Sequence, residues 1–205
     1  MIACHLKLCV LFFCFSQMVL TKQAQLQQEW LRNPDDVWNR TLMCDVYKRS
    51  LRSIADCLFE KPEIAKDICL VDNLTCAIAI VVNSVVARIT IPNSVVLVSS
   101  VTYNAVKLAV QYGCDNVAVL NGGVEIVAVD IPFPILNGNA SSDEVNDRIV
   151  NSYENTLEEI KARGKTVAFA FLDHISSLPS MLLPVERIIS VCRAQGVQEI
   201  LVDGA

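Results

Sequence analysis

The sequence is poor in aromatic and charged residues, and it has almost no histidine. Aromatic side chains make up 6% of the 205 residues and charged side chains 19%, and there are two histidines. So few aromatic rings argue against a platform on which nucleic-acid bases stack. The formal net charge of −5, without a basic stripe, argues against a phosphate backbone as the ligand. We therefore expect no nucleic-acid partner.

Motifs for metals and dinucleotides are missing as well. The nine cysteines form no C-x-x-C pair, and the two histidines do not complete a metal-binding spacing. No G-x-G-x-x-G occurs anywhere in the chain. We expect neither a metal site nor a dinucleotide site. An odd number of cysteines without repeated spacing also makes a disulfide framework improbable, which favours a reducing, cytoplasmic compartment.

The N-terminal segment, residues 1–22, contains a strongly apolar run. Its run Leu8–Leu20 is too short for a standard membrane span, so we expect no stable membrane span. Its length suits the apolar core of a secretory signal, although a clean cleavage site is missing. Three formal glycosylation sequons, at Asn39, Asn73 and Asn139, accompany this secretory alternative. The other interpretation is a buried N-terminus of a cytoplasmic protein.

The C-terminal stretch predicts one β-α-β unit. Thr166–Leu172 is an almost unbroken apolar run, typical of a strand that is covered on both faces. Pro184 opens a helical pattern that Gly196 closes, and Glu199–Val202 is a second buried strand. Strand and helix patterns alternate through residues 23–205, which predicts an α/β fold with a mostly parallel sheet and helices on both faces.

Two further elements are expected from local patterns. Ile68–Val71 is a short apolar run that predicts a strand, followed by a turn and a helix from Ala77. Asn116–Leu120 and Val124–Ile131 predict the two strands of a hairpin, because Asn121-Gly122-Gly123 between them is a favourable turn.

Polar residues follow both strands of the C-terminal unit. Asp173 and His174 end the first strand, and Asp203 ends the second. In open parallel sheets, ligands bind at the carboxyl ends of the strands. A carboxylate at such a position is either a helix cap or a ligand group, so this edge of the sheet is the candidate site.

Several segments resemble one enzyme family. LDHISS, LLPVERIISVCRAQGV and ILVDGA are similar to the core of the class V aminotransferases, and QEWLRNPDDVW, VTYNAVKLAV and VDIPFPI also fit. The nearest subgroup is the isopenicillin N epimerase-like and cysteine desulfurase-like proteins. The resemblance implies pyridoxal 5'-phosphate (PLP) as cofactor and the large domain of a fold type I enzyme. It also implies a homodimer and covalent chemistry on a small amino acid.

The resemblance assigns roles to four residues. Asp203 matches the aspartate that faces the pyridine nitrogen; a carboxylate keeps this nitrogen protonated, so that the ring accepts electrons. Thr75 and Cys76 match the phosphate turn, where Cys76 departs from the usual hydroxyl. A helix N-terminus suits a phosphate there, because free N–H groups and the helix dipole attract anions. Val101 matches the ring-stacking position, which is often a histidine.

The loop after the first strand of the β-α-β unit completes the candidate site. In the family, this loop lies near the phenolic oxygen of the cofactor and the substrate. The resemblance therefore makes His174, Ser176 and Ser177 candidate contacts, with Ser177 preferred.

The family also has a Schiff-base lysine well beyond the aspartate at position 203. All lysines of this sequence precede Asp203, so we expect no catalytic residue in this chain and a domain truncated before that lysine. The expected function is a fragment of a PLP-dependent enzyme with cysteine desulfurase-, desulfhydrase- or epimerase-like chemistry in the full-length parent. The alternative is a non-catalytic binding or interaction module of the same fold. The outcome of the reaction stays open.

Overall fold

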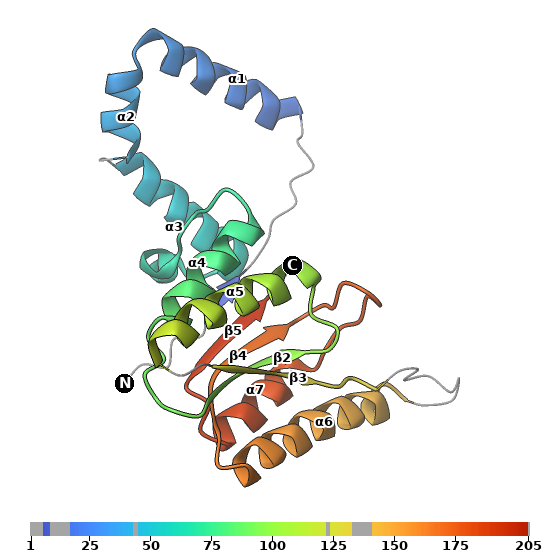
Figure 1. Ribbon diagram of the computed structural model, residues 1–205. Helices are drawn as coiled ribbons and strands as arrows, with labels where there is room; N and C mark the ends of the chain where they lie inside the picture. Colours follow the sequence, from blue (N-terminus) through green and yellow to red (C-terminus); the bar gives the residue numbers. More distant parts are fainter. Residues whose placement is uncertain (1–5, 9–16, 43–44, 122–123, 133–140, 205) are drawn as a thin grey trace. The chain divides into compact units, whose positions relative to one another are not determined.

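The computed structural model describes residues 6–8, 17–42, 45–121, 124–132 and 141–204. They divide into two compact units. One unit contains residues 1–11 and 72–205, and the other contains residues 12–71. The colours of Figure 1 follow the chain through both units.

The larger unit is built on one parallel sheet of β1 (Leu6–Leu8), β2 (Ser94–Ser99), β3 (Glu125–Val129), β4 (Thr166–Asp173) and β5 (Glu199–Asp203). The strand order is β1-β5-β4-β2-β3. Every neighbouring pair is parallel. The expected mostly parallel sheet is therefore confirmed, and the carboxyl ends of all its strands lie at one edge.

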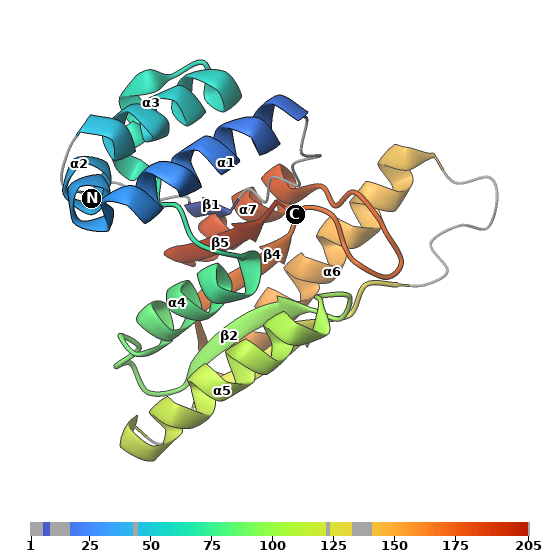
Figure 2. The same cartoon turned by 90° about the horizontal axis from the view of Figure 1, so that it is seen from above.

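Helices cover both faces of this sheet, as expected. One face packs on α4 (Leu74–Val86) and α5 (Asn104–Asn121), and the other on α6 (Ser142–Ala162) and α7 (Val185–Ala194). Figures 1 and 2 show the strands between these two helix pairs. Burial of apolar side chains on both faces is what holds such a three-layer unit together.

A local irregularity in β4 sets which side chains face which layer. Val95 pairs with Val167 but Val96 pairs with Phe169, so Ala168 is an extra residue in β4. After this bulge, Phe169 and Phe171 pack toward α4 and α5. Leu172 packs toward α6 and α7. The bulge therefore keeps the large aromatic rings on one face of the sheet.

The predicted β-α-β unit is confirmed as β4, α7 and β5. Pro184 is the N-cap residue of α7. Gly196 follows the helix with φ +88°, a left-handed conformation that a glycine adopts without strain. The short turn then leads directly into β5.

Two predictions about the middle of the chain are wrong. Residues 68–71 form no strand, and α4 begins at Leu74, three residues earlier than expected. Residues 116–120 belong to α5 instead of a hairpin strand. β3 pairs in parallel with β2, so the connection between them is a helical crossover. A short apolar run fits helix and strand equally well, and the local pattern could not decide between them. Gly122 and Gly123 lie outside the described residues.

The smaller unit is helical. It contains α1 (Gln17–Arg32), α2 (Pro34–Leu42), α3 (Asp45–Phe59) and a 3-10 turn at Pro62–Asp67. Its small core joins Leu51 and Ala55 to Ala65. Of the apolar N-terminal run, Leu8 is the last residue of β1 and 17–20 begin α1, while 9–16 lie outside the described residues. In the part of the chain that the structure describes, no helix is long and apolar enough to cross a membrane.

Candidate functional site

Two carboxylates end neighbouring strands at the carboxyl edge of the sheet. Asp173 is the last residue of β4 and Asp203 the last of β5, and the two are register partners. Register partners on neighbouring strands direct their side chains to the same face. Asp173 is 3% exposed and Asp203 is 7% exposed. The edge therefore buries two acidic groups side by side, which is costly unless hydrogen bonds or opposite charges compensate for the lost hydration.

Hydroxyl groups from the end of β2 surround the first of these carboxylates. Thr102 Oγ1 donates to Asp173 Oδ2 at 2.6 Å, and Ser99 Oγ donates to the same oxygen at 3.3 Å. The backbone N–H of Ser99 in turn donates to Thr102 Oγ1 at 3.1 Å. Ser99 and Thr102 are themselves buried. Asp173 is thus fixed by a buried polar network.

Burial and the hydroxyl network act on the charge of Asp173 in opposite directions. Burial raises the pKa of the Asp173 carboxyl, and the nearby Asp203 raises it further, while the hydroxyls of Thr102 and Ser99 oppose the shift. Tyr153 of α6 lies near the same group, and burial raises the pKa of its phenol. Its hydroxyl is close to Ser99 but has no hydrogen-bond partner among the residues that the structure describes.

The loop after β4 is tied to the end of β5. The backbone N–H of His174 donates to the carbonyl of Asp203 at 2.8 Å, and the His174 carbonyl accepts from Leu183 N–H at 2.9 Å. Ser176 is buried; its hydroxyl accepts from Met181 N–H at 3.1 Å and donates to the Pro179 carbonyl. The Ser176 hydroxyl therefore serves the loop itself.

Ser177, the other serine of this loop, differs from Ser176 in its exposure to solvent. Ser177 is exposed, and His174 is half-buried. Because Ser176 holds the loop from inside, Ser177 is the serine whose side chain faces solvent. Ser177 as the contact of a small molecule stays a prediction.

The phosphate candidates lie in the first turn of α4. Asn73 is the N-cap residue, and its Oδ1 accepts from the backbone N–H of Cys76 at 2.9 Å. Thr75 and Cys76 are exposed. A short turn joins the end of α4 to the start of β2, so the beginning of α4 lies toward the carboxyl edge of the sheet. The Thr75 hydroxyl is on the surface there, whereas the Cys76 amide is already bound by Asn73.

Val101, the candidate for stacking on the cofactor ring, is only partly exposed. Val101 is half-buried and packs against the apolar cluster on the α6 and α7 side. In the same turn, Lys107 Nζ of α5 donates to the Ser100 carbonyl at 2.7 Å. Lys107 thus places an amine beside the turn that holds Val101 and Thr102.

Sequence reasoning missed the network around Asp173. The sequence pattern marks Asp173 as the end of an apolar strand and does not single out Ser99 or Thr102. The available signal was a polar residue directly after each buried strand. That signal marks the edge but not the partners, which lie 71 and 74 residues apart in the chain.

The carboxyl edge carries an acidic group at the end of β5 and a hydroxyl at the start of α4, the two kinds of group that bind a cationic ring nitrogen and a phosphate. The buried carboxyl group of Asp203 is an acceptor for a ring N–H. The start of α4 presents a hydroxyl and the positive end of the helix dipole to an anion. Among the described residues, no group of three or more histidine, cysteine or acidic side chains comes together in a way that would hold a metal ion.

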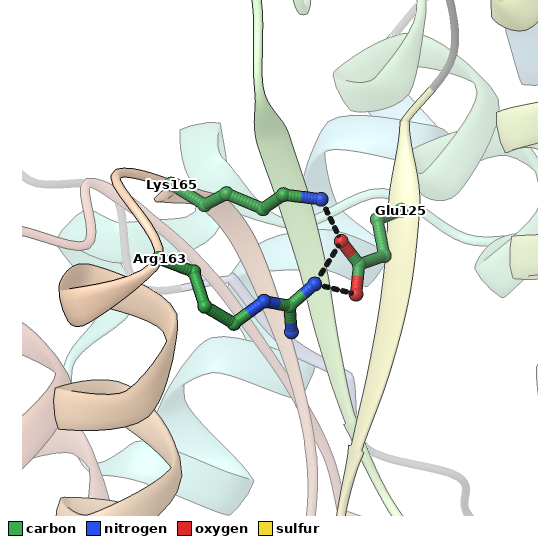
Figure 3. A network of polar contacts seen from close by, with 3 residues as sticks. All are labelled: Glu125, Arg163 and Lys165. Atoms are coloured by element: carbon green, nitrogen blue, oxygen red, sulfur yellow. Dashed lines mark hydrogen bonds and ion pairs between the residues drawn. The ribbon is translucent and has the colours of Figure 1, made fainter.

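The opposite edge of the sheet carries a different arrangement of charge, drawn in Figure 3. Arg163 Nη2 donates to both oxygens of Glu125, at 2.6 and 2.7 Å, and Lys165 Nζ donates to Oε2. Hydrogen bonds from these two cations lower the pKa of the Glu125 carboxyl. This carboxylate is partly exposed and fully paired.

Comparison with curated sequences finds plant enzymes. The chain is 30% identical over 199 residues to a putative L-cysteine desulfhydrase 1 of Oryza sativa subsp. japonica. It is also 30% identical over 201 residues to an L-cysteine desulfhydrase of Arabidopsis thaliana. Each match covers 95% of this chain but 38% and 40%, respectively, of the relative. The chain thus spans about two fifths of the length of these relatives. No family model matches it.

Comparison with solved structures finds enzymes of one fold. A cystine C-S lyase in complex with cysteine persulfide has a TM-score of 0.52 and 17% identity, over 93% of this chain and 39% of that chain. An archaeal alanine:glyoxylate aminotransferase has a TM-score of 0.58 and 17% identity, over 90% of this chain and 41% of that chain. In another structure of the lyase, glycine is covalently linked to the PLP cofactor. The chain therefore has the fold of the fold type I PLP-dependent enzymes, with plant L-cysteine desulfhydrases among its sequence relatives.

Proposed function

We propose that this chain forms the part of a PLP-dependent enzyme that binds the cofactor's ring and phosphate. The parent enzyme would act on a small sulfur-containing amino acid, in keeping with its desulfhydrase relatives. One observation carries the proposal: Asp203 is buried at the carboxyl end of β5, where the sheet of such an enzyme presents an aspartate to a ring nitrogen. Within this family, we further propose the class V subgroup, from the LDHISS and ILVDGA segments.

Each residue would have one task. When bound, PLP supplies an aromatic system that withdraws electrons from a substrate carbon. The Asp203 carboxylate would hold the proton on the ring nitrogen, and its backbone is fixed for this by the N–H of His174. The Thr75 hydroxyl would bind the phosphate, and Val101 would cover one ring face. Ser177, on the loop after β4, would contact the ring's phenolic oxygen or the substrate.

Binding by this chain would be non-covalent under the proposal. Lys107 places an amine at the same edge of the sheet, but the Ser100 carbonyl holds that amine. The alternative function is a non-catalytic module of the same fold.

Equilibrium dialysis with PLP tests the proposal. We expect the wild-type chain to bind PLP and Asp203→Asn to bind it about 10- to 100-fold more weakly, because the charged hydrogen bond to the ring is lost. Thr75→Val should weaken binding of PLP more than binding of pyridoxal, which lacks the phosphate. Glu125→Gln, at the opposite edge, is the matched control and should bind like wild type. Equal binding by wild type and Asp203→Asn would overturn the assignment.

A second experiment separates the enzymatic from the non-catalytic function. Borohydride reduction of the PLP complex should fix no pyridoxyl group on a specific lysine, and the chain alone should release no sulfide from cysteine. Mass spectrometry of the peptide containing Lys107 is the sharpest check. Stoichiometric label on Lys107, lost in Lys107→Arg, would show that this chain has its own covalent attachment point.

Two finer features of the parent enzyme are also proposed. We propose a homodimer, supported by exposed large apolar side chains on α1 and α2, namely Met18, Leu26, Trp30, Leu31 and Trp38. Sedimentation equilibrium of wild type and of a Trp30→Ser, Trp38→Ser variant checks this. We propose a cytoplasmic location, supported by the cysteines at 57, 69, 76, 114 and 192, which form no disulfide among the described residues. Endoglycosidase treatment checks it, since a mobility shift would favour the secretory pathway.

A further inference from the structure

The turn that joins β2 to α5 is bound to the strands on both sides of β2. Toward β3, Ser100 N–H donates to the Val129 carbonyl at 2.8 Å, and Ser100 Oγ accepts from Ile131 N–H at 3.0 Å. Toward β4, Thr102 Oγ1 donates to Asp173 Oδ2 at 2.6 Å. The first and last residues of this three-residue turn are therefore fixed to different strands.

A lysine of α5 supplies a third tie to the same turn. Lys107 Nζ donates to the Ser100 carbonyl at 2.7 Å, reaching back seven positions along the chain, and the side chain is half-buried. Lys107 lies in the first turn of α5, which begins at Asn104. The helix dipole disfavours a cation at this end of a helix. The stability of the helix therefore does not account for a lysine here, whereas the bond to the Ser100 carbonyl does.

We propose that Lys107 is a positioning residue for the ring site. Through the Ser100 carbonyl it holds the turn so that Val101 covers one face of a ring bound at the carboxyl edge. The inference rests on the proposed function, in which Val101 has that task. Lys107 itself would contact neither the ring nor the phosphate.

Val101 depends on the ties made by its two neighbours. It lies between Ser100 and Thr102, so its backbone follows the positions of those residues. Its side chain packs against the apolar cluster on the α6 and α7 side and is half-buried. A β-branched side chain is stiff about its first torsion angle, so the backbone also determines where the two methyl groups lie. Loss of one tie to the turn would therefore displace the methyl groups of Val101.

Methyl NMR of chain labelled at its valines tests this effect without any cofactor. Val101→Ala assigns the Val101 signals by removing them. We expect the Val101 signals of Lys107→Met to be shifted or broadened relative to wild type, because the turn has lost its tie to α5. Lys161→Met, which removes an exposed lysine of α6, is the matched control and should leave these signals unchanged. Unchanged Val101 signals in Lys107→Met would overturn the proposal.

Equilibrium dialysis with PLP and with pyridoxal separates positioning from direct contact. Lys107→Met should weaken binding of both compounds by the same factor, about 3- to 10-fold, because the ring face is affected and the phosphate is not. A greater loss for PLP, as expected for Thr75→Val, would show that the amine attracts the phosphate directly and would contradict the proposal. Lys107→Arg can donate to the same carbonyl and should bind both compounds like wild type.

Ser100→Ala loosens the same turn from its other side. It removes the hydroxyl oxygen that accepts from Ile131 N–H, and it should repeat both results of Lys107→Met. Weaker binding in Ser100→Ala with unchanged Val101 signals would show that the ring does not depend on the turn, which contradicts the proposal.

Urea denaturation of the same variants excludes a role in stability alone. A lower urea midpoint of Lys107→Met, with binding by the folded chain equal to that of wild type, would assign Lys107 to stability and reject positioning. Failure of the proposed function is seen separately. If the wild-type chain binds neither PLP nor pyridoxal, the proposed function is rejected, and the Val101 signals alone decide whether Lys107 holds the turn.

Discussion

The two edges of the parallel sheet handle acidic side chains in opposite ways. At the amino edge, Glu125 is partly exposed and bound by the cations of Arg163 and Lys165, which lower its pKa. At the carboxyl edge, Asp173 is buried beside a second acid, and its pKa is raised. Folding alone explains the first arrangement, since a solvated ion pair costs little. The second arrangement opposes folding, and such costs accumulate where a protein binds or reacts.

The largest effect is expected from neutralising the buried acid. Because the pKa of Asp173 is raised in the folded state, the native chain holds this proton more tightly than the unfolded chain does. Its contribution to stability is therefore lost as the pH rises from the unfolded pKa of about 3.9 through the native value. Asp173→Asn should stabilise the larger unit at pH 7 by about 1–2 kcal/mol, and the gain should disappear below about pH 4.

Hydrogen exchange of the β4 backbone amides measures the stability of the larger unit, which contains Asp173. The two tryptophans, Trp30 and Trp38, lie in the helical unit, so their fluorescence would report on other residues. Slower exchange in Asp173→Asn at pH 7 is the expected result. Faster exchange would mean that the charged carboxylate stabilises the fold, and the contrast between the edges would fail.

A smaller effect is expected at the phenol next to this acid. The Tyr153 hydroxyl is buried without a hydrogen-bond partner among the described residues. An unsatisfied buried polar group costs about 1–3 kcal/mol, so Tyr153→Phe should raise the free energy of unfolding by about 1 kcal/mol. Urea denaturation followed by circular dichroism, with Tyr103→Phe at an exposed tyrosine as control, checks this. A loss of stability would show that the hydroxyl makes a favourable contact.

The smallest effect is expected at the amino edge. Glu125→Gln should cost less than about 1 kcal/mol and should cost less still in high salt, because exposed ion pairs are screened. The lowered pKa of Glu125 gives the opposite pH dependence from that of Asp173. Its contribution is present above the unfolded pKa of about 4.3 and is lost as the pH falls through the native value. A stability profile that rises at low pH in the wild type but not in Glu125→Gln would contradict this sign.

Much of the larger unit could be predicted from local patterns. The runs Thr166–Leu172 and Glu199–Val202 are buried on both faces, and such strands are apolar throughout. The connection from α5 to β3 was mispredicted because a short apolar run and a glycine pair fit a hairpin as well as a helix end. Only the parallel pairing of β3 with β2, a tertiary fact, decides between them.

In the candidate site, too, some features follow from the sequence and others only from the three-dimensional structure. The resemblance selected Asp203 and Thr75, and simple strand ends selected the carboxyl edge. The hydroxyls of Ser99 and Thr102 bind Asp173 across more than 70 residues of chain. No local pattern encodes such a pairing, so the network around Asp173 emerged only from the three-dimensional arrangement.

The central claim is that Asp203 carries a charge which keeps the ring nitrogen of PLP protonated. Nitrogen-15 NMR of PLP labelled at that nitrogen, bound to the chain at pH 7, tests it directly. The account predicts the chemical shift of a protonated pyridine nitrogen in the wild-type complex and of an unprotonated one in Asp203→Asn at saturating PLP. An unprotonated nitrogen in the wild-type complex would contradict the account.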